Sequence, residues 1–85
     1  MKIIKTSKWY DPEGLNIPND DVDVLYQGNY TACLAQLKNM RDQKEKYFSD
    51  RDDIDVSPIQ NDEEYEYFVI YYISAIAKTY FSIVK

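Results

Sequence analysis

The sequence has no histidine, one cysteine and only two glycines among its 85 residues. Without histidine, no Ser–His or Cys–His catalytic pair can form, and the commonest transition-metal ligand is missing. The single cysteine, Cys33, cannot close a disulfide within the chain, so the sequence is not that of a disulfide-rich secreted scaffold. Two glycines are too few for a loop that cradles phosphate. We therefore expect a protein that is not an enzyme and that holds no metal and no cofactor.

No hydrophobic run is long enough to cross a bilayer. Residues 68–84 are the most apolar stretch, but Lys78 interrupts them, and a lysine near the bilayer centre costs about 2.5–3.5 kcal/mol. The first residues carry lysines at positions 2, 5 and 8 and lack the apolar segment of a secretory signal. We expect a cytoplasmic protein with no membrane partner.

The residues that are present indicate one folded domain over 1–85. Hydrophobic residues make up 45% of the chain and aromatic residues 15%, which is too apolar for a disordered segment even at a net charge of −5. A domain of this size buries its surface incompletely, so it needs an aromatic-rich core or a second copy to be stable.

The negative charge is concentrated in two connecting stretches. Residues 11–23 carry five acids, and residues 49–66 carry eight acids against Arg51 alone. By contrast, segments 24–48 and 67–85 each have a net charge of +2. Such a field repels nucleic acid and attracts a basic surface, so we expect a protein partner and no direct nucleic-acid binding.

The first half of the chain predicts two strands and a helix. Residues 2–10 are rich in β-branched and aromatic side chains, DPEG at 11–14 is typical of a turn, LNIPNDD continues it as a loop, and residues 22–28 alternate as a second strand. Asn29 is placed to cap a helix over residues 30–48. The apolar face expected for that helix carries Tyr30, Cys33, Leu34, Leu37, Met40 and Tyr47.

The second half is harder to interpret. In the acidic connection 49–64, Ile54 and Val56 could add a short strand that Pro58 would stop. Residues 65–84 show helical periodicity, yet fourteen of them are β-branched or aromatic, which favours strands at 65–73 and 79–84 with SAIAK in the turn. The missing Gly, Asn or Asp in that turn counts against the hairpin.

We therefore predict an α+β fold: a small ββαββ domain whose antiparallel sheet has one helix packed across one face. The alternative is that segment 62–84 is helical. Because one helix covers about two strands at a diameter of about 10 Å, one sheet face should stay open or meet another molecule. The aromatic interface expected there consists of Tyr65, Tyr67 and Tyr71.

In overall character the chain resembles small acidic proteins encoded by phages and prophages of low-GC bacteria, including many anti-CRISPR proteins. The likeness lies in its size, its acidity, its richness in Tyr, Asn, Lys and Ile, and the order strand, DPEG turn, strand, then GNYTACLAQL opening a helix. What the resemblance implies is a phage-type inhibitor in the host cytoplasm that occupies the basic nucleic-acid-binding surface of a host protein as a nucleic-acid mimic.

Two hypotheses of function follow, and both remain open at this point. In the first, the acidic stretches bind a host protein with a basic surface. In the second, a structural or assembly protein forms a homodimer or larger homo-oligomer through an aromatic sheet face. The acids expected to bind a partner in the first hypothesis are Asp20, Asp21, Asp23, Asp50, Asp52, Asp53, Asp55, Asp62, Glu63 and Glu64.

Overall fold

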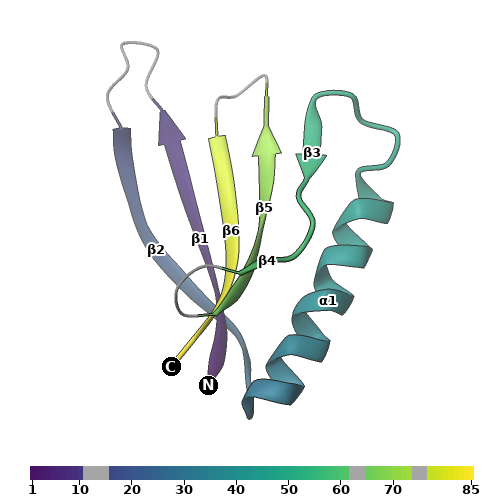
Figure 1. The fold of residues 1–85 in the computed structure, drawn as a ribbon. Helices are drawn as coiled ribbons and strands as arrows, with labels where there is room; N and C mark the ends of the chain where they lie inside the picture. Colours follow the sequence, from purple (N-terminus) through teal and green to yellow (C-terminus); the bar gives the residue numbers. More distant parts are fainter. Residues whose placement is uncertain (11–15, 62–64, 74–76) are drawn as a thin grey trace.

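In the computed structural model, one helix packs against a single twisted sheet (Figure 1). The structure describes residues 1–10, 16–61, 65–73 and 77–85, with the side chains of 8–10 and 16–21 left out. The elements follow in the order β1 (Lys2–Tyr10), β2 (Asn16–Gln27), α1 (Tyr30–Tyr47), β3 (Ile54–Val56), β4 (Gln60–Asn61), β5 (Glu66–Tyr72) and β6 (Ala77–Val84).

The sheet is antiparallel throughout and has six strands. Its order is β2-β1-β6-β5-β3, and the two-residue strand β4 also pairs with β5. The predicted α+β class, the antiparallel sheet and the single helix are confirmed. The predicted ββαββ order is wrong in its strand count, because two short strands between α1 and β5 cover the outer edge of β5.

Strand β2 begins at Asn16, so the prediction of a loop over residues 16–21 is wrong. Tyr10 pairs with Asn16 and Lys8 with Pro18, which extends the first hairpin to the ends of both strands. Pro18 is tolerated because β2 lies at the edge of the sheet and next to a register shift between Thr6 and Lys8. The predicted DPEG turn lies outside the described residues.

The helix follows the sequence prediction closely at its start. The side-chain oxygen of Asn29 accepts a hydrogen bond from the Ala32 backbone N–H at 2.8 Å, as expected of an N-cap. Cys33 and Leu37 are fully buried against the sheet. Tyr47 is not on this packed face, however: it is 75% exposed, and the C-cap residue Phe48 packs against the core in its place.

The C-terminal hairpin is confirmed, and the helical alternative for segment 62–84 is wrong over its described residues. Strands β5 and β6 pair from Tyr67↔Ser82 to Tyr72↔Ala77. Strand formation lets Phe68 and Ile70 point to one face and Tyr67 and Tyr71 to the other, whereas a helix would leave several large side chains without a packing surface. Of the expected SAIAK turn, residues 74–76 lie outside the described residues, and Ala77 and Lys78 already belong to β6.

The core lies between α1 and one face of the sheet. Phe68 and Phe81 pair across β5 and β6, and their rings stack at a centroid distance of 4.6 Å. Ile3, Ile70 and Ile83 are buried beside them. The shortest dimension of the molecule is 21 Å, which is room for a sheet and a helix, each a layer about 10 Å thick. The second face of the sheet is therefore not covered by another element of the described chain.

Ser57 continues the pairing along β5 after β3 ends. Its backbone N–H donates to the Val69 carbonyl at 2.8 Å, and its hydroxyl oxygen accepts from the Val69 N–H at 2.8 Å. The next residue is Pro58, which has no N–H to continue a regular strand. A side-chain hydroxyl therefore replaces a backbone carbonyl as the acceptor for a buried amide.

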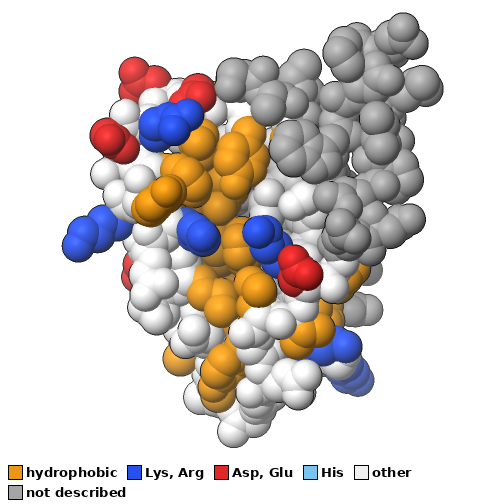
Figure 2. All heavy atoms as spheres, turned by 180° about the vertical axis from the view of Figure 1, so that it is seen from behind, with side chains coloured by type: hydrophobic (Ala, Val, Ile, Leu, Met, Phe, Trp, Pro, Cys, Tyr) orange, Lys and Arg blue, Asp and Glu red, His pale blue; other side chains and the backbone are white. Residues whose placement is uncertain are grey.

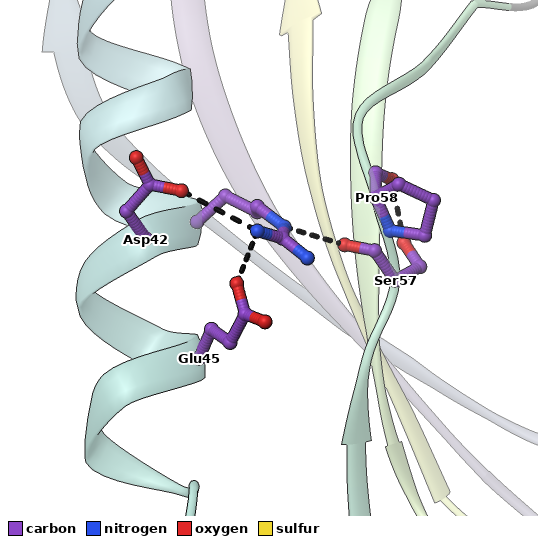
Figure 3. Close-up of polar contacts among 5 residues, drawn as sticks. Asp42, Glu45, Ser57 and Pro58 are labelled. Carbon is purple, nitrogen blue, oxygen red and sulfur yellow. Dashed lines mark hydrogen bonds and ion pairs between the residues drawn. The ribbon is translucent and has the colours of Figure 1, made fainter.

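Arg41 ties the middle of α1 to this junction (Figure 3). Its Nε donates to the Ser57 carbonyl at 3.0 Å, while its Nη1 forms ion pairs with Glu45, one turn further along the helix, and with Asp42. The guanidinium thus bridges two layers, which holds the connection after β3 against the helix.

Candidate functional site

The uncovered face of the sheet is defined by strand alternation. Residues that pair directly across an antiparallel ladder point to the same side. Since Phe68, Phe81 and Ile3 face the helix, their neighbours in sequence face the other way. We call this surface the open face; it contains Lys2, Ile4 and Thr6 of β1, Val22 and Val24 of β2, Tyr67, Val69 and Tyr71 of β5, Lys78, Tyr80, Ser82 and Val84 of β6, and Asp55 of β3.

Three tyrosines form the centre of the open face. The Tyr67 hydroxyl donates to Gln60 Oε1 at 3.0 Å, and its ring lies 6.5 Å from the Tyr80 ring between centroids. The Lys78 ammonium sits 5.4 Å from the centroid of the Tyr71 ring, in the geometry of a cation–π contact. These contacts hold the rings of Tyr67 and Tyr71 in place on the face of the sheet.

The packing of the rings is tight enough to bury a valine. Val69 is only 2% exposed although it points away from the helix. Its neighbours on the open face are Tyr67 and Tyr71 along β5 and Tyr80 across on β6. Tyrosine suits such a position because its ring covers apolar surface while its hydroxyl stays in contact with water or a polar partner.

Towards β2 the open face becomes aliphatic and more exposed. Val22 is 53% exposed and Val24 47%, and they pair with Thr6 and Ile4 of β1. In the view from behind Figure 1, hydrophobic side chains form a band down the middle of the molecule, with Lys and Arg side chains among them (Figure 2). The acidic side chains visible in that view gather mainly at one corner.

The predicted aromatic interface is divided by the structure. Tyr67 and Tyr71 lie on the open face. Tyr65 precedes β5 and lies on the helix side, where its ring is 6.1 Å from that of Tyr30 and packs against the core. Tyr80 lies at the centre of the open face instead. The alternation of TYFSIV in the sequence puts Tyr80 and Ser82 on one face, but only the register with β5 shows that this is the face of Tyr67 and Tyr71.

Beside Tyr65, a carboxylate joins the start of the helix to the start of β5. The Tyr30 hydroxyl donates to Glu66 Oε1, which also accepts from the Asn61 side-chain amide at 3.3 Å. The hydrogen bond to this carboxylate, with desolvation and the carboxylate charge, raises the pKa of Tyr30 above 10.0. The contact links the start of α1 to the start of β5.

The described members of the predicted acidic partner-binding set lie at opposite edges of the sheet. Asp23 lies on β2, opposite Lys5, at one edge of the sheet. Asp50, Asp52, Asp53 and Asp55 lie in or beside β3, at the other edge. The side chains of Asp20 and Asp21 are outside the described part, as are residues Asp62, Glu63 and Glu64.

At the β3 edge, one of the four aspartates is paired and the others are exposed. Arg51 bonds Asp53 through Nε at 3.1 Å and Nη2 at 3.2 Å, which raises the pKa of the guanidinium further. Asp50, Asp52 and Asp55 are exposed. An open groove of about 240 Å³ lies between this edge and the end of α1, lined in part by Phe48 and Ser49. The charged residues Glu45, Arg51 and Asp55 also line it.

Within the described residues, no group of three or more His, Cys, Asp or Glu side chains is placed to hold a metal ion. No helix of the described chain is long and apolar enough to span a membrane. Cys33 is buried, with its thiol 3.7 Å from the Gly28 carbonyl oxygen, in the position of a small core residue.

Comparison with family models, curated proteins and solved structures finds no match for this chain. The open face and the acidic edge are therefore the features of the described chain that bear on function.

Proposed function

We propose that this chain is an assembly protein that binds a second copy of itself through the open face of its sheet. The observation that carries the proposal is that no element among the described residues covers the aromatic and aliphatic sheet face that contains tyrosines 67, 71 and 80. Exposed apolar patches of this extent on small domains mark interaction sites.

The size of the open face fits a pair of small domains. Four strands spaced about 4.8 Å apart and about 24 Å long present roughly 460 Å² to a partner, and the three residues of β3 add about 50 Å². Two copies would therefore bury about 1,000 Å², the smallest area expected of a specific interface. The composition also fits, since tyrosine is enriched at interface centres and charged groups at their rims. A domain of 85 residues gains stability from such association because its own core is small.

Analytical ultracentrifugation over a range of concentrations tests the proposal. The wild-type chain should sediment as a species of twice 10.1 kDa, and Tyr67→Ser and Tyr71→Ser should shift the equilibrium towards monomer. Tyr47→Ser is the matched control, because Tyr47 is exposed at the end of the helix and not on the sheet. A wild-type chain that stays monomeric at its solubility limit would overturn the proposal.

A second proposal, the phage-type inhibitor, is supported by the acidic edge. Asp50, Asp52 and Asp55 are all exposed within six residues, and Arg51 bonds the fourth aspartate, Asp53. Carboxylates displayed in this way would attract the basic groove of a nucleic-acid-binding host protein, with association that weakens as salt is added.

The test of the acidic edge uses an oligolysine peptide as a basic probe in titration calorimetry. The triple change Asp50→Asn, Asp52→Asn and Asp55→Asn should weaken binding, whereas Asp23→Asn at the far edge of the sheet should not. Equal affinities of the triple variant and the Asp23→Asn control for the peptide would show that the β3 edge is not the binding site.

A further inference from the structure

The two middle rows of the open face contain no charged side chain. Across β1, β6 and β5, the registers place Ile4, Ser82 and Tyr67 in one row and Thr6, Tyr80 and Val69 in the next. Strand β2 adds Val24 to the first row and Val22 to the second.

Lys2 and Lys78, the lysines of the open face whose side chains the structure describes, lie outside these rows. Lys2 pairs with Val84 in the row beyond one side, and Lys78 pairs with Tyr71 in the row beyond the other. Asp55 lies in the same row as Lys78, at the β3 edge. The face therefore has an uncharged centre and charged ends along the strand direction, the arrangement of an interface core and its rim.

Large and small side chains alternate between the two rows. On β6, Tyr80 is followed two residues later by Ser82; on β5, Tyr67 is followed by Val69. The large residue stands in the second row on β6 and in the first row on β5. Each row thus offers a small side chain wherever the other row offers a ring on the same strand.

From this pattern we infer that two copies pack face to face about a two-fold axis that crosses the strands between the two rows. The inference rests on the self-association proposed above. Under this symmetry each row faces the other row of the second copy, so that Tyr80 lies against Ser82 of the partner subunit and Tyr67 against Val69 of the partner subunit. Rings then fill the space above small side chains, as interdigitating layers do in a core.

A two-fold axis parallel to the strands is disfavoured by the same residues. Strand β6 is the middle strand of the sheet. An axis along it would place Lys78 opposite Lys78 of the partner subunit and Tyr80 opposite Tyr80 of the partner subunit. Two ammonium groups opposed at an interface repel, and two rings of equal size hold the sheets apart over Ser82. The axis across the strands leaves Lys2 and Lys78 at the rim, where their ammonium groups stay in water.

Exchanging the large and small residues of β6 tests the axis. Tyr80→Ser alone leaves two cavities in the pair of copies, and Ser82→Tyr alone opposes ring to ring, so each should weaken self-association by at least about tenfold. The double variant Tyr80→Ser, Ser82→Tyr restores a ring over a small side chain at both sites. Its dissociation constant should return to within about threefold of the wild-type value.

Mixing the two single variants gives an independent readout. A Tyr80→Ser chain and a Ser82→Tyr chain are complementary across the proposed axis, so they should form a mixed pair, detected by energy transfer between labelled chains, under conditions in which neither pairs with itself. Circular dichroism checks that each variant folds. If Ser82→Tyr does not fold, the exchange Ile4→Thr, Thr6→Ile on β1 applies the same test.

The outcomes separate the axis from the self-association. If the double variant is as weak as the single variants and the mixture does not pair, while Tyr67→Ser still dissociates the wild-type assembly, the axis is wrong and the assembly function stands. If the wild-type chain is a monomer, both the proposed axis and the proposed self-association are wrong.

Discussion

The two faces of the sheet are built by the same strands, yet they carry different chemistry. On the helix side, β5 and β6 present the buried apolar residues Phe68, Ile70, Phe81 and Ile83, beside the buried hydroxyl of Thr79. On the open face the same strands present tyrosines, serine and lysine, most of them half-buried. Along each strand, residues of the two sets alternate one by one.

This difference shows how a small domain prepares one face for its own core and the other for a partner. A face that is covered during folding can be entirely apolar, because water never returns to it. A face that must survive in water before it meets a partner needs rings with hydroxyls and flanking charges, which limit non-specific association. The choice of Tyr rather than Phe at positions 67, 71 and 80 fits that requirement.

The largest expected effect is a difference in stability between the two faces. Phe68→Ala should lower the free energy of unfolding by about 3–5 kcal/mol, because the ring is fully buried and stacked on Phe81. Tyr71→Ala should lower it by less than about 1.5 kcal/mol, because its ring is half-buried on the open face. Urea denaturation followed by circular dichroism, at the lowest workable concentration, measures both. Equal losses would mean that the open face is part of the core of the single chain.

A second variant tests the hydrogen bond that holds the edge of β5, a strand with residues on both faces. Ser57→Ala removes the acceptor of the buried Val69 N–H and should cost about 1–3 kcal/mol of unfolding free energy. Hydrogen exchange should speed up at Val69 in particular. Ser49→Ala is the control, because its hydroxyl donates to the Lys46 carbonyl at an exposed site. A loss no greater than that of the control would show that water replaces the Ser57 hydroxyl.

The smallest expected effect is a pH dependence on the helix side. The pKa of Tyr30 is raised by its hydrogen bond to Glu66, so the protonated phenol is favoured in the folded state. Its contribution to stability is therefore complete below pH 10.0 and is lost as the pH rises through the higher pKa of the folded state. Tyr30→Phe should flatten the alkaline decline of unfolding free energy, and Tyr47→Phe should leave it unchanged. Identical alkaline curves for wild type and Tyr30→Phe would contradict this account.

Local signals in the sequence were sufficient for several elements. Asn29 before an apolar-periodic stretch predicted the start of α1, and the β-branched and aromatic content of 65–84 outweighed its helical periodicity correctly. The loop predicted at 16–21 was wrong, because an edge strand accepts Pro18 within a segment whose Asn and Asp residues are typical of loops. Tyr47 was misplaced because the helix ends there and Phe48, outside the periodic pattern, turns back onto the core.

The candidate surface could be predicted only in part. Alternation along YEYFVIYYI separated Tyr67 and Tyr71 from Phe68 and Ile70, but it did not say which face the helix covers. Tyr80 was not included, because its position beside Val69 depends on the pairing of two strands. The acidic residues appeared as two clusters along the chain, and the sequence contained no indication that the described members lie at opposite edges of the sheet.

By itself, the sequence determined the elements: the capped helix, the alternating strands, and the absence of a histidine-based catalytic or metal site. These depend on contacts between residues a few positions apart, which periodicity and capping express directly. Tertiary structure alone decided the strand order β2-β1-β6-β5-β3, the rows of the open face and the separation of the acids. Those features depend on the register between strands distant in the chain, which is set when the apolar face of the sheet is buried under the helix.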